Sequence, residues 1–510
     1  MSSELKKEVI KTGKKLKETS CEQRIDMDIT LPDYCADIKK ILRCNLMPGV
    51  HTVSLSGERV SAKGTGTVRV IYLAEGDKLD SFEKSVDLST SAQIKELSPE
   101  SVVTATAVAD FVNCRAVSQR KIGISAGVST IFSLYGASED FFALAEEEGS
   151  IQAKKEKLMC EKHLGFFEKI FDLSETVSLA GEHPPVGKII SCSCRVANPS
   201  HKLSSGKLLI KGEAVTEICY VPEKSENTFH ILSHSMPISQ IIDLRDVEDG
   251  ANCAVRLKVC QQLCTVKADS SGSNRLVEVA LRVSAFVHAY EKKECEVITD
   301  CYCTDFETEQ SFEVPDFLCP VREISEQGQA KAEVELSSPV KEICFAKCLE
   351  TAENIKYTED NVKLECSALV LIMYIDDNGV PCLAEKNLDF DLSYSIVKKC
   401  SEPFGSFEIE PIGLSCAVSA GSKTELTFDY LVSGRVYCSC EKKILKKLTV
   451  LEDKPKKSGD AALTLYFTDK DENLWDIARS HNTTVGLIME ENGLKTESLK
   501  EKVMLLIPCC

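Results

Sequence analysis

The sequence predicts a mainly β protein, in which tandem β-sandwich or barrel-like modules are followed by a small β-α-α-β domain. Runs of Val, Ile, Leu and Tyr end in turns of Gly, Pro, Asp or Asn, which is typical of strands that enter hairpins. Three sequence landmarks recur in the same order along the chain, which indicates repeated modules. Near the C-terminus the pattern changes to two short amphipathic helices between two apolar strands.

The composition is that of a folded protein: of 510 residues, 43% are hydrophobic, 27% are charged and 6% are aromatic. At this length we expect about three to five domains. The net charge of -18 argues against nucleic-acid binding, because neutralising phosphates requires clustered Lys and Arg. No apolar run reaches the roughly 20 residues of a membrane-spanning helix, so we expect no membrane span.

Residues 1–20 are predicted to form a basic leader, since this segment carries six lysines. Leu5, Val9, Ile10 and Leu16 would give it the apolar stripe of an amphipathic helix, which we expect to be solvated rather than anchored in a membrane. No apolar core follows the lysines, so the leader is not a secretory signal. We therefore expect the protein to stay on the cytosolic side of a membrane.

The chain contains 25 cysteines but no C-x-x-C pair. Without a secretory signal these thiols are expected to stay free and to pack as small apolar groups. Closely spaced pairs, such as Cys192 with Cys194 and Cys301 with Cys303, would place both thiols on the same face of a strand. Structural zinc sites usually combine C-x-x-C knuckles, so we predict neither a metal site nor a cofactor.

Three apolar segments end alike, at Tyr72, Tyr220 and Tyr374, which lie 148 and 154 residues apart. The landmark before each is DIKKILRC, PVGKIISC or PVKEICFAKC, and the landmark after each is RKIGISAGV, RLVEVALRV or TELTFDYLV. The strand ending at Tyr72 alternates between Val68 or Val70 and more polar residues, so we expect one buried face there. The strand ending at Tyr374 is apolar on both faces and should be central in its sheet.

These landmarks predict three β-modules, at residues 21–138, 175–310 and 311–451. A helical bridge is expected between the first two, at residues 139–174, because Ala, Glu, Lys and Leu are abundant there. The charged segment at residues 452–461 contains Pro and Gly and is the clearest linker in the chain.

The domain at residues 462–508 begins with the strand LTLYFT and continues with the helix DENLWDIARSH. The acidic first turn of that helix suits the helix dipole. Leu474, Ile477 and Ala478 form its apolar stripe, with Trp475 beside them. This helix should pack its stripe against the two strands of the domain.

The second helix of this domain is VGLIMEEN, and Thr483 or Thr484 would cap its first turn. It ends at Gly493, a natural residue for the position after a helix. The apolar run KVMLLIP then returns as a strand that Pro508 ends.

This pattern resembles the LysM domain. The resemblance rests on NLWDIA and on the segments Asn482–Val485, Asn492–Leu494 and Leu505–Pro508. It implies binding of N-acetylglucosamine glycans in a shallow groove between two loops, Lys470–Asn473 and Leu494–Ser498. Most of the matching positions are core positions, so they indicate the fold more strongly than the ligand.

One departure from the family bears on the ligand, because Asp471, Glu472 and Asn473 replace the usual glycine-aspartate-threonine. Two acids add desolvation cost for a neutral sugar, and losing the glycine restricts close approach of the backbone. The candidate partner- or glycan-binding residues are Asp471, Glu472, Asn473, Leu474, Trp475, Leu494, Lys495 and Thr496. For Trp475, a role in the core is an equal alternative.

The segment LPDYCADIKKILRC, from Leu31 to Cys44, together with the repeated tyrosine strands and the strand that starts at Arg120, resembles the SPOCS domain. That family occurs in spore-forming clostridia, often as tandem copies ending in one LysM domain. The resemblance implies a non-enzymatic scaffold of spore-envelope morphogenesis, in the mother-cell cytoplasm at the forespore surface and in the spore coat. Its LysM domain would dock onto a coat morphogenetic protein, a SpoIVA-like ATPase of the coat basement. The alternative is a peptidoglycan-binding protein of the wall or cortex.

Two enzyme-like motifs are predicted to be non-catalytic. GISAG, at residues 123–127, matches the nucleophile elbow, but a strand-like run follows Ser125 where the elbow needs a helix. DMDIT, at residues 26–30, imitates an aspartyl-phosphatase signature, but a mostly polar segment precedes it. The chain also has no G-x-x-x-x-G-K-[ST] phosphate loop. We therefore predict no catalytic residues.

Overall fold

The computed structural model describes residues 7–95, 97–143, 150–224, 228–396, 402–456, 462–499 and 501–508. Its regular structure is almost entirely antiparallel β-sheet, and two short α-helices lie near the C-terminus. The predicted mainly β fold is confirmed.

Three six-stranded units, called modules 1, 2 and 3 below, repeat one topology. Module 1 comprises β1 (Lys7–Thr30), β2 (Ile38–Ser56), β3 (Arg59–Ala74), the 3-10 turn η1 (Glu75–Asp77), β4 (Leu79–Gln93), β5 (Val102–Ser118) and β6 (Lys121–Ala143). Module 2 comprises β7 (Ile151–Ser178), β8 (Val186–Ser204), β9 (Lys207–Pro222), β10 (His230–Asp243), β11 (Asn252–Lys267) and β12 (Leu276–Cys303). Module 3 comprises β14 (Leu318–Glu335), β15 (Val340–Tyr357), β16 (Asn361–Asp376), β17 (Pro381–Ser395), β18 (Pro403–Ala420) and β19 (Lys423–Ser439).

Within each module two three-stranded sheets face each other across a hydrophobic core. The sixth strand lies between the first and the fifth, while the second, third and fourth form a meander. In module 1, for example, Val70 and Tyr72 of β3 pack in one core with Ile122 and Ile124 of β6. The alternating strand pattern of the sequence produces these inward-facing rows, because successive side chains point to opposite faces.

The tyrosine strands β3, β9 and β16 are each central in their sheet, as expected for β16. The expectation of one buried face at β3 is wrong, since Ile71 on its other face is only 2% exposed. A second core buries that face, and it joins Ile71 of module 1 to Cys219 of module 2 and Met373 of module 3. The outer faces of the three sheets therefore pack together and make the modules one body.

Both predicted helical segments in the first part of the chain are wrong. The expected leader helix is part of β1, which pairs with β6 along its length, although residues 1–6 lie outside the described chain. The expected bridge at residues 139–174 is the end of β6 and most of β7, with residues 144–149 not described. Leu158, Phe166 and Phe171 are buried along β7. Pairing with β12 therefore outweighs the helix propensity of the many Lys and Glu residues.

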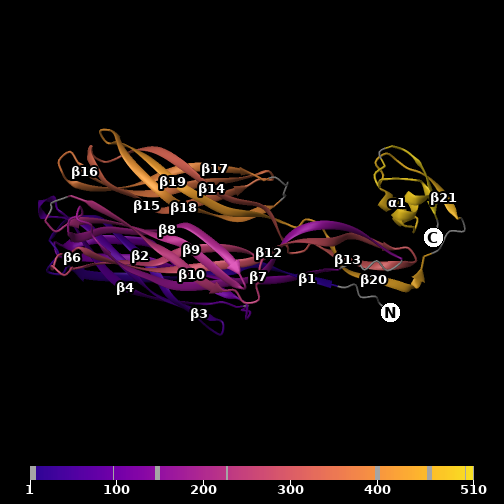
Figure 1. Cartoon of the computed structure of the whole chain (residues 1–510), viewed down its shortest axis with the longest axis horizontal. Helices are drawn as coiled ribbons and strands as arrows, with labels where there is room; N and C mark the ends of the chain where they lie inside the picture. The colour runs from indigo at the N-terminus through magenta and orange to yellow at the C-terminus, as the bar shows by residue number, and fades with distance from the viewer. Residues whose placement is uncertain are drawn as a thin grey trace.

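Figure 1 shows an elongated molecule, in which modules 1, 2 and 3 lie together and a stalk of strands extends from them. The stalk contains the ends of β7 and β12 and a two-stranded sheet of β13 (Phe306–Glu313) and β20 (Ile444–Pro455). Its own core includes Phe142, Cys160, Cys295, Phe317 and Ile444. The expected linker at 452–461 is partly strand, because β20 runs to Pro455, and residues 457–461 are not described.

The C-terminal domain lies at the far end of the stalk (Figure 1). It consists of β21 (Leu463–Phe467), α1 (Leu474–Ser480), α2 (Val485–Glu491) and β22 (Met504–Pro508). The two strands pair antiparallel, so the predicted β-α-α-β order is confirmed.

Candidate functional site

The helix caps of the C-terminal domain follow from single polar residues. Asn473 is the N-cap of α1, and its side-chain oxygen accepts a hydrogen bond from the Trp475 amide at 3.0 Å. Thr484, one of the two predicted caps, accepts from the Leu487 amide at 3.1 Å and begins α2. Gly493 follows α2 with φ of 60°, a left-handed conformation that glycine adopts without strain.

The first candidate loop, Lys470–Asn473, contains a non-glycine residue in a backbone conformation that glycine favours. Asp471 has φ of 62°, which lies in the left-handed region. The carboxylate of Glu472 stabilises the loop, because it accepts from the Tyr466 hydroxyl at 2.7 Å and from the Asp469 amide at 3.0 Å. Glu472 is therefore engaged within the domain, whereas the Asp471 side chain is exposed.

The structure brings the two candidate loops together, as the sequence predicts. Asn473 forms an isolated antiparallel bridge with Ser498, which ties the first loop to the second. Lys495 and Thr496 are exposed, while Leu494 is half-buried against the domain core. Asp471, Lys495 and Thr496 are thus the predicted residues most open to a partner.

The two remaining predicted residues differ in exposure. Leu474 is 0% exposed and packs with Ile477, Ile488 and Leu505 in the domain core, so it has no surface to offer a partner. Trp475 is half-buried and lies at the edge of that core.

Trp475 attaches the C-terminal domain to the stalk. Its indole Nε1 donates to Oδ2 of Asp300 at 2.8 Å, and its ring meets the Tyr302 ring edge-on with centroids 5.0 Å apart. Arg479 forms an ion pair with Asp300 at 3.0 Å. The Tyr302 hydroxyl donates to the Thr483 carbonyl at 2.8 Å. The domain is therefore docked on the end of β12.

Sequence reasoning missed Asp300, Tyr302 and Arg479. Asp300 and Tyr302 end an alternating strand, where they resemble many other polar and aromatic strand residues. Contacts across about 175 residues leave no local pattern in one sequence. The one available signal was the chain's single tryptophan, since an indole N–H that is partly buried usually finds an acceptor.

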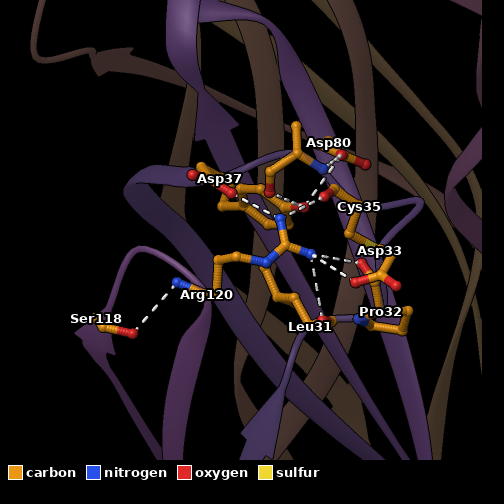
Figure 2. Close-up of polar contacts among 10 residues, drawn as sticks. Leu31, Pro32, Asp33, Cys35, Asp37, Asp80, Ser118 and Arg120 are labelled. Atoms are coloured by element: carbon orange, nitrogen blue, oxygen red, sulfur yellow. Dashed lines mark hydrogen bonds and ion pairs between the residues drawn. The ribbon is translucent and has the colours of Figure 1, made fainter.

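A second polar site lies in module 1, where Arg120 holds the loop before β2. Figure 2 shows its guanidinium at the centre of the loop residues. It donates to Oδ1 of Asp37 at 2.6 Å and to the carbonyls of Pro32 at 2.9 Å and Cys35 at 3.2 Å. These contacts tie the loop to the turn before β6, and Tyr34 at the tip of the loop is 76% exposed.

The repeated tyrosines explain why this loop recurs. The Tyr72 hydroxyl donates to the Ala36 carbonyl at 3.0 Å, and Tyr220 does the same to Pro184 at 3.1 Å. Tyr374 instead shares hydrogen bonds of 3.1 Å with the hydroxyls of Ser337 and Ser338. Each tyrosine is 0% exposed, and burial raises the pKa of the Tyr72 and Tyr220 phenols.

Module 2 repeats the arginine but module 3 does not. Arg275 donates to the carbonyls of Ala180 at 2.8 Å and Leu179 at 3.1 Å, as Arg120 does in module 1. The equivalent residue in module 3 is Ser422, whose carbonyl accepts from the Leu336 amide at 2.9 Å. The first two modules are therefore closer to each other than either is to the third.

The two enzyme-like motifs lie side by side on β1 and β6, where Asp26 is opposite Ser125. Ser125 is in the middle of a continuous strand, so the strand–turn–helix of a nucleophile elbow is not formed. Asp28 forms an ion pair with Lys121 at 2.7 Å, which lowers the pKa of the carboxyl.

Within the described part of the chain, no group of three or more His, Cys, Asp or Glu side chains is placed to hold a metal ion. Among the same residues, neither α-helix is long and apolar enough to cross a membrane.

Comparison with known families agrees with this geometry. The family model described as the SipL SPOCS domain matches residues 37–117 and 185–267, and the LysM domain model matches residues 469–508. The chain thus contains two segments that match the SPOCS domain and one that matches the LysM domain, an arrangement that resembles SipL. No curated protein and no solved structure matches the chain. The two SPOCS matches span β2 to β5 and β8 to β11, so the strands that complete each sandwich lie outside them.

The family model does not match module 3, which nevertheless repeats the strand order of the two modules that it does match. Module 3 arranges its six strands as modules 1 and 2 do, and Tyr374 occupies the place of Tyr72 and Tyr220. The absence of the loop arginine, replaced here by Ser422, is one feature that separates it from the other two.

Proposed function

We propose that this SPOCS and LysM protein is a non-enzymatic scaffold of spore-envelope morphogenesis. In this proposal it works in the mother-cell cytoplasm at the forespore surface, and its LysM domain docks onto a coat-basement protein, a SpoIVA-like ATPase. The family matches support the sporulation role. The docking role is supported mainly by the position of the LysM domain. Trp475 attaches the domain to the end of the stalk, and Asp471, Lys495 and Thr496 remain exposed there.

The charges on the LysM loops favour a protein partner over a neutral sugar. Asp471 and Lys495 are both exposed, and charged groups of this kind mainly set the specificity and association rate of protein complexes. A glycan groove has to desolvate the same carboxylate without a compensating cation on the ligand.

Peptidoglycan binding is the second candidate function, and one observation favours it. Asp471 stands where the family usually has a glycine and has φ of 62°, a conformation that glycine adopts without strain, and the Asn473–Ser498 bridge closes the two loops on each other. The backbone of this chain is therefore compatible with a groove between the two loops, although the loop side chains differ from those usual in the family.

The deciding experiment measures retention of the full-length protein on two matrices, immobilised coat-basement ATPase and intact peptidoglycan sacculi. We expect retention on the ATPase alone. The charge changes Asp471→Asn and Lys495→Glu should each weaken that retention about tenfold, and asparagine tolerates the left-handed backbone at position 471, so folding stability should stay nearly unchanged. Lys202→Glu, an exposed charge reversal in module 2, is the matched control. Retention on sacculi alone would replace the scaffold with a glycan binder.

A further inference from the structure

Cysteines occupy equivalent positions in the repeated modules. On the second strand, Cys44 of module 1 is opposite Val70, and Cys192 of module 2 is opposite Ile218. Each of these opposite residues lies two positions before the buried tyrosine of its module. The two cysteines therefore have the same place in the fold.

The fifth strand carries a second equivalent cysteine in all three modules. Cys114 is opposite Ile124, Cys264 is opposite Val279, and Cys416 is opposite Leu426. In each module one backbone carbonyl accepts a hydrogen bond from the start of the loop before the second strand, and it belongs to Arg120, Arg275 or Ser422. The residue opposite each cysteine lies four positions after that residue. The register thus identifies these cysteines as structural equivalents.

The second and fifth strands are edge strands of opposite sheets, and they run close beside each other along one seam of the sandwich. In module 1 Cys44 and Cys114 both pack against the core between the two sheets, and their thiols interact across this seam. In module 2 the thiols of Cys192 and Cys264 do the same. Module 3 has Ala346, opposite Ile372, at the position of Cys44 and Cys192. Modules 1 and 2 therefore each contain both cysteines, whereas module 3 contains only the one on its fifth strand.

We propose that modules 1 and 2 each contain a modification site, a seam dithiol that a small-molecule disulfide oxidises to an intramolecular disulfide. All four cysteines are free in the structure. Because the two cysteines of each pair face one core across a single seam, side-chain movement can bring their sulfurs to the S–S bond length of about 2.05 Å. Sandwiches of the immunoglobulin type use a disulfide between sheets in a comparable way.

The exchange proceeds in two balanced steps. The thiolate of Cys114 attacks one sulfur of the reagent, whose S–S bond breaks and releases one thiol. The thiolate of Cys44 then attacks the mixed disulfide at the Cys114 sulfur and expels the second thiol. In total, two protein S–H bonds and one reagent S–S bond become one protein S–S bond and two reagent S–H bonds. The protein loses two electrons and the reagent gains them.

The surroundings of each pair favour one attacking thiol. The hydrogen bond with Cys44 lowers the pKa of Cys114, which also borders an open hollow of about 560 Å³. In module 2 the hydrogen bond with Cys264 lowers the pKa of Cys192, and Arg69 favours its thiolate further. Cys192 is only 3% exposed, so the reagent should reach module 1 sooner.

The test treats the reduced full-length protein with oxidised glutathione, alkylates the remaining thiols and maps the unreduced digest by mass spectrometry. We expect two cross-links, Cys44–Cys114 and Cys192–Cys264, each with a mass lower by two hydrogens, and the first should form faster. Alkylation of these four cysteines after prolonged oxidation would overturn the proposal, as would their recovery only as glutathione adducts.

A gain-of-function variant tests the geometry directly. Ala346→Cys supplies the thiol that module 3 lacks and should give a cross-link between position 346 and Cys416. Ala332→Cys is the matched control, since Ala332 faces the same core from β14, the far edge strand of the sheet that holds Cys416. Circular dichroism confirms that each variant keeps its strand content. If Ala346→Cys gives no such link, or Ala332→Cys gives one equally well, the seam is not the determinant and the proposal fails.

Discussion

The indole of Trp475 donates its N–H to the carboxylate of Asp300, and this contact joins the LysM domain to the C-terminal end of β12. Arg479 neutralises the same carboxylate from the next turn of α1. The side chain that marks the LysM helix start is thus used within the chain, and the loops beside it remain available to a partner.

Replacing Asp300 with Ala should release this contact. The indole would lose its acceptor and with it the restraint that holds its edge-on contact with Tyr302, so Trp475 should become more exposed. Because the chain has a single tryptophan, its fluorescence reports this site alone. We expect a red shift of the emission and stronger quenching by acrylamide.

Glu296→Ala is the matched control for this change, because Glu296 lies on the same strand and forms only a long ion pair of 3.7 Å with Lys155. It should leave the emission unchanged. An Asp300→Ala variant with the wild-type spectrum would show that packing on Tyr302 suffices to seat the domain.

The LysM domain could be predicted from the sequence because its signals are local. Thr484 caps the helix that directly follows it, and Gly493 ends that helix. Alternation along β12 likewise marks its buried row, in which Val277, Val279 and Val283 are 0% exposed. Such patterns are complete within about ten residues, so one sequence contains them.

The segment at residues 139–174 could not be predicted in this way. Its composition favours a helix, but β12 offers a long partner strand and Phe166 and Phe171 bury their rings in the paired conformation. The site at Asp300 was missed for the same reason, since it exists only after distant segments meet. Long-range pairing decides both cases, and propensity does not record it.

Arg120→Gln should loosen the loop before β2. The guanidinium binds three carbonyls of this loop and the Asp37 carboxylate, and glutamine cannot reach all four acceptors. We expect faster hydrogen exchange in residues 31–37 and a lower folding stability, because the loop loses several hydrogen bonds to a charged donor. Exchange measured by mass spectrometry checks the first effect, and Arg115→Gln, an exposed arginine on β5, is the control.

If the Arg120→Gln loop exchanges as slowly as the wild-type loop, the Tyr72 hydroxyl is the dominant anchor. Tyr72→Phe would then be the variant that releases the loop, since it removes the hydrogen bond to the Ala36 carbonyl.

The contact between His163 and His288 should make the protein less stable in acid. Nδ1 of His163 lies 3.2 Å from Nε2 of His288, and burial lowers their pKa values to about 4 and about 3. The unfolded value is about 6.5, so the folded state favours the neutral rings. The stabilisation is fully present above pH 6.5 and is lost as the pH falls from there toward 4.

At pH 5 this linkage removes about 2 kcal/mol per histidine relative to neutral pH. Thermal unfolding at pH 5 and pH 7.5 measures this loss of stability. His288→Phe should reduce the difference between the two pH values, because it removes one of the titrating rings. Phenylalanine should fit at this position, since Phe166 stacks on the His288 ring and Phe286 stacks on Phe166. His234→Gln changes a half-buried histidine whose ring contacts the Glu175 carboxylate at 3.1 Å, and it serves as the control. Equal pH sensitivity in all three proteins would assign the acid loss to carboxylates instead.

The ammonium group of Lys347 is buried where the three modules meet. It donates to the Ser191 hydroxyl at 2.6 Å, and burial lowers its pKa to about 8, with Arg69 and Arg43 adding repulsion. An unfolded lysine has a pKa of about 10.4, so the unfolded chain binds this proton more tightly than the folded protein does. The folded state therefore loses stability as the pH falls from 10.4 toward 8.

Lys347→Met should therefore stabilise the junction at neutral pH. It removes a charge whose burial costs about 3 kcal/mol by linkage, and its thioether fills similar space, although the hydrogen bond to Ser191 is lost. We expect a net gain of about 1–2 kcal/mol, measured by thermal unfolding at pH 7.5, and a smaller gain at pH 10. Lys331→Met, at an exposed lysine of β14, should change neither value. A Lys347→Met protein that is less stable at both pH values would show that the ammonium is needed to hold the modules together.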